Sequence, residues 1–134
     1  MPNKREHRDA GAWAGALLAC ALNYKVQVDR IKLDPNYQLN IVELGAFGLL
    51  GYAAGSVGGR LPDIFEPSYS PGHRDVFHSV AFGAAACWGA KKVNDHPTIG
   101  REVKMAVNTV MAGYISHLAL DAQTPAGLPL LSRR

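Results

Sequence analysis

The chain has 134 residues, of which 48% are hydrophobic and 19% charged, and its formal net charge is +3. This length fits a single domain, 1–134, and the balance excludes an intrinsically disordered chain, which would be less apolar and more highly charged. The mild positive charge is compatible with an anionic ligand but does not specifically indicate nucleic acid. Cys20 and Cys87 lie in short apolar runs, so we expect free, buried thiols.

Three elements are predicted in the first half of the chain. Residues 9–23 read as a structural helix, because acidic residues interrupt its charged start and no cleavage site of a secretory signal follows. Residues 24–34 alternate between apolar and polar side chains, which predicts a short strand or hairpin. After Asp34-Pro35 a second helix is expected over 37–57, where four glycines would allow neighbouring helices to approach closely.

The second half of the chain is predicted to contain two more helices. Pro62, Pro67 and Pro71 make residues 60–74 a predicted loop, which is followed by helices over 75–92 and 101–122. The fold class is therefore mainly α: a small bundle of about four helices with a short β-hairpin-like insertion.

One apolar run raises the question of a membrane. Ile41–Gly58 has 18 residues and would span about 27 Å, close to the ~30 Å hydrocarbon core of a bilayer. Its Glu43 and its richness in Gly and Ala favour a soluble bundle, with membrane association as the alternative. We therefore expect a cytoplasmic or inner-membrane-associated protein that is not secreted.

Acidic and imidazole side chains are concentrated in residues 60–79, as expected of a metal site, a phosphate site or a polar loop. Asp63 follows a proline and could equally be a turn former or helix cap. His73 and His78 would diverge by about 140° on one helix. If His73 ends the loop while His78 enters the next helix, both can point at one centre.

The strongest local pattern is the pair His117 and Asp121, which lie on one helical face that is expected to face the core. A buried imidazole and carboxylate must be hydrogen-bonded or bind a metal, so a structural couple is the alternative to a ligand pair. Imidazoles and carboxylates without thiols indicate a divalent metal, Zn²⁺ first and Mn or Fe as alternatives. His96 and both cysteines are predicted to be bystanders.

Four stretches together carry a family resemblance: His7, Gly59–Asp63, His73–Ser79 and Gly113–Leu130. The joined motifs resemble the membrane-bound metal-dependent hydrolases often called YdjM-like, a helical family remotely similar to zinc-dependent phospholipase C. The resemblance implies six metal ligands: His7, Asp63, His73, His78, His117 and Asp121. Where that family has a second Asp after its Leu-Pro-Asp motif, this chain has Ile64. Glu66 then either replaces a ligand, acts as the general base or is a loop charge.

The expected activity is metal-assisted hydrolysis of a phosphoester, on a lipid or a nucleotide, through a metal-activated water. Arg74 would bind the substrate phosphate, or else form a salt bridge with Asp75 or Glu66. Thr124 would hydrogen-bond a metal ligand. The alternatives are a metal-stabilised binding or assembly protein without turnover, and a membrane-associated protein that packs its glycine-rich helix against a partner. Expected partners are a small phosphorylated substrate or lipid, a membrane surface and a second copy of the chain.

Overall fold

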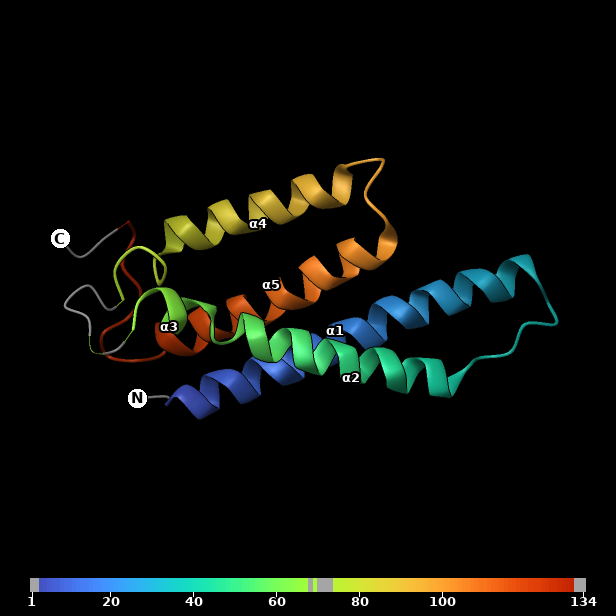
Figure 1. The fold of residues 1–134 in the computed structure, drawn as a ribbon, viewed down its shortest axis with the longest axis horizontal. Coiled ribbons are helices and arrows are strands. Elements are labelled where there is room, and N and C mark those ends of the chain that lie inside the picture. Colours follow the sequence, from blue (N-terminus) through green and yellow to red (C-terminus); the bar gives the residue numbers. More distant parts are fainter. Residues whose placement is uncertain (1–2, 68, 70–73, 132–134) are drawn as a thin grey trace.

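Four long helices and one short helix make up the fold. The computed structural model describes residues 3–67, 69 and 74–131. In chain order the elements are α1 (Lys4–Leu33), α2 (Ile41–Gly58), α3 (Leu61–Phe65), α4 (Val80–Asp95) and α5 (Arg101–Ala122). Successive long helices run in opposite directions, so the start of α1, α3 and the end of α5 meet at one end of the bundle, here called the site end (Figure 1). The opposite end, with the 34–40 and 96–100 loops, is called the far end. The predicted mainly α-helical bundle is confirmed.

The predicted strand or hairpin at 24–34 is wrong, because α1 continues without a break to Leu33. No strand occurs in the ranges that the structure describes. Asn23 and Gln27 are both buried, and the Gln27 side-chain amide donates to Asn23 Oδ1 at 2.7 Å. Helical spacing of four puts the two amides on one face toward α2. This tertiary packing overrides the alternating apolar pattern that predicted a strand.

The loop predicted over 60–74 is only partly irregular, since Leu61–Phe65 forms α3. Pro62 occupies the first turn of α3, where a helix needs no backbone N–H donor. The next helix starts later than the predicted residue 75, because the Ser79 side chain accepts a hydrogen bond from the backbone N–H of Phe82 and caps α4 at Val80. The last helix has the predicted bounds, 101–122.

Close contacts between glycines hold α1, α2 and α5 together. A Cβ atom added to Gly15 would lie 2.2 Å from the carbonyl oxygen of Gly51, and one added to Gly113 would lie 2.1 Å from that of Gly55. Any side chain at these positions would push the helix backbones apart. The contacts continue to Gly59, where a Cβ would lie 2.5 Å from the carbonyl oxygen of His7. Helix packing therefore brings the first turn of α1 to the end of α2.

Side chains are distributed in the reverse of the usual soluble pattern. Large apolar side chains face outward: Leu17 is 69% exposed and Leu49 75% exposed. The side chains that are fully buried are mostly polar ones: His78, His117, Gln27, Asn23, Asp121 and Ser79. Small residues between helices and apolar residues outside are typical of helices that pack within lipid. Ile41–Phe65 is long and apolar enough to cross a membrane.

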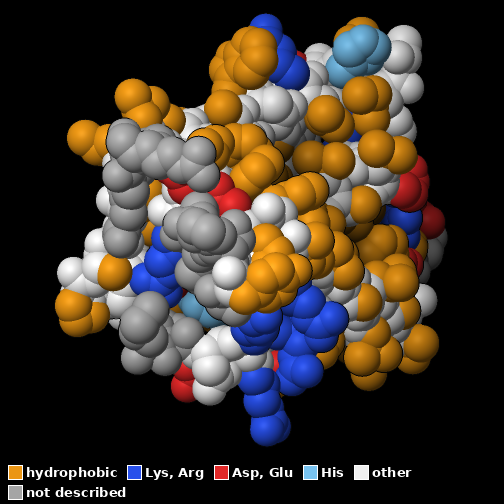
Figure 2. Space-filling view, turned by 60° about the vertical axis from the view of Figure 1, so that its left-hand side comes forward, with side chains coloured by type: hydrophobic (Ala, Val, Ile, Leu, Met, Phe, Trp, Pro, Cys, Tyr) orange, Lys and Arg blue, Asp and Glu red, His pale blue; other side chains and the backbone are white. Residues whose placement is uncertain are grey.

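The surface and the cysteines agree with this distribution. Figure 2 brings the site end toward the viewer and shows hydrophobic side chains over much of the visible surface, with Lys and Arg side chains gathered beside them. Cys20 and Cys87 are both free, as predicted, but Cys87 is exposed and Cys20 only half-buried. The expectation of buried thiols is wrong, and for Cys87 the reason is that α4 packs chiefly against α5 and leaves much of its own surface uncovered.

Candidate metal centre

The candidate centre lies at the site end, where four segments distant in sequence meet. The first turn of α1 supplies His7, α3 supplies Asp63, and the last turns of α5 supply His117 and Asp121. His78 directly precedes the Ser79 cap of α4. The structure thus brings together five of the six predicted ligands. The sixth, His73, lies outside the described residues.

Two of these imidazoles, His78 and His117, each lie close to both carboxylates, Asp63 and Asp121. His78 Nε2 lies 3.6 Å from Asp63 Oδ1 and 3.8 Å from Asp121 Oδ2. His117 Nε2 lies 4.0 Å and 3.3 Å from the same two oxygens. Four ligands placed tetrahedrally at 2.0–2.2 Å from a zinc ion would be about 3.3–3.6 Å apart. The His–Asp distances are equal to these separations or slightly longer, and Asp63, His78 and His117 form one candidate group of three ligands.

His7 belongs to a second, overlapping group with His117 and Asp121. Its Nε2 lies 3.4 Å from Asp121 Oδ1, and its ring stacks on that of His117 with centroids 3.8 Å apart. His117 belongs to both groups, yet one imidazole nitrogen can ligate only one ion. Asp121 faces both groups, with Oδ1 toward His7 and Oδ2 toward His78 and His117.

Hydrogen bonds at the outer nitrogens fix the direction of two imidazoles. His117 Nδ1 lies 2.8 Å from the carbonyl oxygen of Gly59, which can only accept, so Nδ1 carries the proton. His78 Nδ1 lies 2.9 Å from Glu66 Oε2 and donates in the same way. Each ring therefore turns its Nε2 lone pair toward the two aspartates, as metal-ligating histidines do.

Glu66 lies behind His78 and organises the loop before α4. Its carboxylate accepts hydrogen bonds from the backbone N–H groups of Asp75, Val76 and Phe77 at 3.0, 2.6 and 3.0 Å. Burial raises the pKa of Glu66, but the bonds from His78 and from the backbone outweigh burial, so its pKa is lower than usual. These contacts make Glu66 a support for His78 in the described structure.

Arg74 forms its ion pair with Asp121, and not with Asp75 or Glu66 as expected for the structural alternative. Its guanidinium lies 2.5 Å from Asp121 Oδ1 and donates to Thr124 Oγ1 at 3.1 Å. Thr124 in turn donates to the backbone carbonyl of Asp121 at 2.7 Å. The backbone of Arg74 has a φ of 62°, in the left-handed region that costs energy for a residue with a side chain. Thr124 thus contacts Asp121 through its backbone carbonyl and also holds the guanidinium of Arg74.

The electrostatics of the centre favour ionised carboxylates. Burial raises the pKa of Asp121, but the nearby imidazoles of His117 and His7 and the charge of Arg74 outweigh it, so its pKa lies far below the usual range. Within the described residues, His7 Nδ1, His117 Nε2 and Asp121 Oδ2 are buried without a hydrogen bond. Buried polar atoms usually have partners, and a cation between His117 Nε2 and Asp121 Oδ2 would satisfy both.

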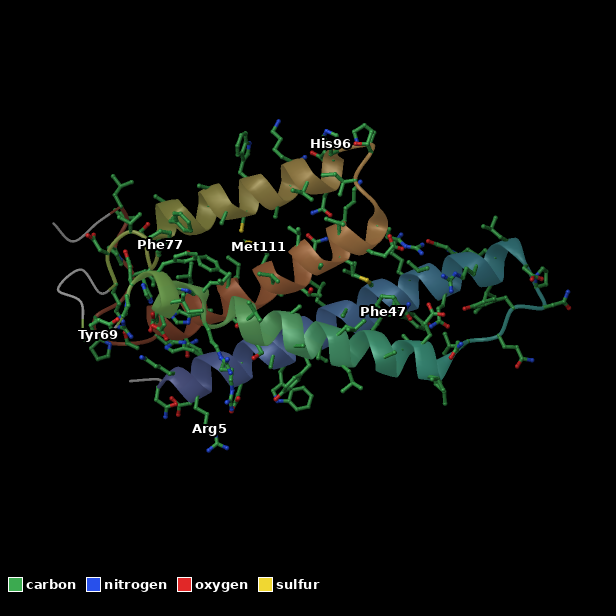
Figure 3. The ribbon with its side chains drawn as sticks, viewed as in Figure 1. Arg5, Phe47, Tyr69, Phe77, His96 and Met111 are labelled. Carbon is green, nitrogen blue, oxygen red and sulfur yellow. The ribbon has the colours of Figure 1, made fainter. Side chains whose placement is uncertain are left out.

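Two contributions to the centre were not predicted from the sequence. The Gly59 carbonyl orients His117, and the Tyr114 hydroxyl donates to the carbonyl of Phe77 at 2.5 Å, which supports the turn before His78. The sequence spacing places Tyr114 on the same face of the helix as His117. It does not show that Tyr114 contacts Phe77, which lies 37 residues away. His96 lies at the far end, away from the centre, where it contacts Thr98 (Figure 3).

Comparison with known proteins gives one family. No curated protein and no solved structure matches the chain. The sequence profile described as "YdjM inner membrane protein" matches residues 1–132, nearly the whole chain. This match, together with the outward-facing apolar side chains, favours the membrane-associated alternative over the soluble bundle. The chain belongs to the YdjM inner membrane protein family.

Proposed function

We propose that this protein is a metal-dependent hydrolase of phosphoesters that works at the inner membrane. The observation that carries the proposal is the approach of four donor atoms, on Asp63, His78, His117 and Asp121, to within 3.3–4.0 Å for the pairs measured. The outer nitrogens of both histidines are held by separate partners, which leaves their inner nitrogens directed at the carboxylates. A divalent ion such as Zn²⁺ is the ligand that this donor set fits best.

A bound divalent ion would supply an acidified water and would polarise the phosphoryl group of a substrate. Asp63 and Asp121 would balance the two charges of one ion, so the guanidinium of Arg74 adds a positive charge that a phosphoester could compensate. Asp121 and Thr124 hold two of its nitrogens, and its Nε makes no hydrogen bond in the described part of the chain. Arg74 is thus the candidate phosphate-binding residue.

Glu66 has a positioning role in this proposal. Its oxygens are occupied by His78 and by three backbone N–H groups, and its lowered pKa makes it a poor proton acceptor. It would keep His78 in the tautomer that ligates through Nε2.

A second candidate function, a metal-stabilised binding or assembly protein without turnover, has one observation in its favour. Four protein donors can complete a tetrahedral shell, and closed shells are typical of structural zinc sites. Asp63, whose side chain is 15% exposed, is the most accessible of the four. Hydrolysis requires a coordination position that water can reach, next to Asp63, whereas a purely structural site would have no such position.

The test is metal analysis of the detergent-purified protein, followed by hydrolysis of water-soluble phosphomonoesters and phosphodiesters with and without chelator. We expect bound metal and chelator-sensitive hydrolysis in the wild type. His117→Ala should lose both, whereas His96→Ala, a matched control at the far end, should keep both. Absence of metal from the wild type after reconstitution with zinc, manganese and iron would contradict both candidate functions.

The Arg74→Lys variant distinguishes the hydrolase from the metal-stabilised binding protein. Lysine keeps a positive charge near Asp121 but loses the planar fork that suits paired phosphate oxygens. The hydrolase proposal expects retained metal and at least about tenfold lower kcat/KM. Retained metal, no hydrolysis by the wild type and a melting temperature that falls on chelation would favour the binding protein.

A further inference from the structure

The candidate metal centre lies where the uncharged middle of the bundle ends. Residues 10–24, 44–58 and 105–120 of α1, α2 and α5 contain no Asp, Glu, Lys or Arg. At 1.5 Å per residue these segments cover about 22–24 Å, most of the ~30 Å hydrocarbon core of a bilayer. Asp121 follows the last of them directly. In a membrane, the centre would therefore lie at the level of the lipid headgroups of one leaflet.

Apolar and basic side chains surround the centre at this level. Ile64 and Phe65 of α3 are more than half exposed, and Tyr69 projects from the site end (Figure 3). Lys4 and Arg5, at the start of α1, are exposed at the same end, and Arg5 points away from the bundle. Exposed apolar side chains beside cations suit the boundary between acyl chains and anionic headgroups.

Two mainly apolar hollows lie along α5, on the acyl-chain side of this level. One, of about 380 Å³, is formed by α1, α2 and α5. Its lining is mostly apolar and includes Phe47, Leu50, Ala54 and Ala106, together with Glu102 and Thr109. The second, of about 260 Å³, is open and lies on Ala106, Val107, Val110 and Met111. Ala106 lines both hollows, so they adjoin at this residue. Figure 3 places Met111 between α4 and α5.

The distance from the centre to the hollows matches the depth of one leaflet. Met111 and Ala106 precede His117 by 6 and 11 residues, which corresponds to about 9 and 16 Å along α5. Half of a ~30 Å hydrocarbon core is about 15 Å. A lipid with its headgroup at the metal centre would therefore bring an acyl chain to Ala106.

We propose that the substrate is a membrane lipid phosphoester whose acyl chain lies in the hollows around Ala106 while its headgroup is at the metal centre. This inference rests on the proposed hydrolase function and names its substrate class. For a lipid phosphomonoester, the bond between phosphorus and the glycerol oxygen breaks. Water supplies hydroxide to phosphorus and a proton to the leaving oxygen, and the products are inorganic phosphate and a neutral diacylglycerol.

The experiment compares two substrates that share a phosphomonoester: dioleoyl phosphatidic acid in detergent micelles and glycerol 3-phosphate in water. Ala106→Phe places a large side chain at the one lining residue that the two hollows share. Ala53→Phe, the same change at an exposed alanine on α2 that lines neither hollow, is the matched control. We expect Ala106→Phe to lower kcat/KM for phosphatidic acid at least about tenfold and to leave glycerol 3-phosphate hydrolysis within about twofold. Ala53→Phe should change neither.

A binding measurement supplies a readout that is independent of turnover. Retention of dioleoyl phosphatidic acid by the purified protein should fall in Ala106→Phe and not in Ala53→Phe. Equal hydrolysis of both substrates by the wild type, or equal losses on both in Ala106→Phe, would overturn the lipid assignment and leave the hydrolase function standing. No hydrolysis of either substrate by metal-loaded protein would overturn the hydrolase function and this inference with it.

Discussion

The two ends of the bundle both bury polar side chains, but only the far end satisfies them with its own partners. At the far end, the Gln27 amide donates to Asn23 and to the carbonyl of Asn40, and it accepts from the backbone N–H of Asn40. Asn23 donates to Glu43, which also pairs with Arg30. Five residues make up this network: Asn23, Gln27, Arg30, Asn40 and Glu43.

At the site end, in contrast, the described structure leaves His7 Nδ1, His117 Nε2 and Asp121 Oδ2 buried and without hydrogen bonds. A network in which every donor and acceptor is paired holds helices together. A network that leaves buried polar atoms without hydrogen bonds can bind a ligand through those atoms. The difference indicates that burial of polar groups serves stability at the far end and ligand binding at the site end.

The largest expected effect comes from removing the negative charge of one carboxylate at the site end, compared with the same change at the far end. We expect Asp121→Asn to lower metal affinity more than about 100-fold and, because Arg74 then stays buried without a carboxylate, to destabilise the fold by about 3–5 kcal/mol. Glu43→Gln at the far end should leave metal affinity unchanged. Metal titration and denaturant unfolding measure the two quantities. Normal metal binding by Asp121→Asn would remove Asp121 from the candidate centre.

Glu66→Gln should have the next largest effect on metal. The amide cannot accept as strongly from His78 Nδ1 and three backbone N–H groups, so His78 would lose its fixed orientation. Loss of such support for a ligand lowers metal affinity by about 10–100-fold. Competition with a chromogenic chelator measures the change. If hydrolysis disappeared while metal affinity remained at the wild-type value, Glu66 would take part in proton transfer and its positioning role would be wrong.

Two glycine substitutions test whether close helix packing supports the metal centre. In Gly59→Ala the new Cβ would meet the carbonyl oxygen of His7 at 2.5 Å, so we expect about 1–3 kcal/mol of destabilisation and weaker metal binding. Gly45→Ala is the control, because its Cβ would have no other atom within 4 Å. It should stabilise α2 by up to about 1 kcal/mol. Thermal unfolding and metal titration of both variants test the contrast.

The smallest expected effects come from the helix caps at the two ends. Ser79→Ala and Asn40→Ala each remove a side-chain cap, from α4 and α2 respectively, and each should cost about 1 kcal/mol. Only Ser79 adjoins a candidate ligand, His78, so only Ser79→Ala should also weaken metal binding. Equal metal affinities in the two variants would show that the cap does not position His78.

Parts of the fold and of the candidate centre were predictable because they depend on residues close together in sequence. The His117 and Asp121 pair was found from helical spacing, and the last helix was predicted with the bounds that it has. The clustering of Asp63 and His78 in one polar segment marked the loop as a candidate site. These predictions needed only the helical period and the chemistry of the side chains.

Other parts depend on contacts between segments that lie far apart in sequence. The partner of Arg74 is 47 residues away, and the carbonyl that orients His117 is 58 residues away. The prediction of a strand at 24–34 failed for the same reason, since the buried partners of Asn23 and Gln27 come from the start of α2.

The sequence by itself determined that the protein is helical, that glycines allow its helices to touch, and that imidazoles and carboxylates gather at a few positions. These properties follow from local backbone preferences and side-chain chemistry. Only the tertiary structure decided that the polar residues lie inside and the large apolar ones outside, and that Glu66 supports His78 while Arg74 holds Asp121. Burial and pairing depend on which surfaces meet when the helices pack, and no local pattern specifies that meeting.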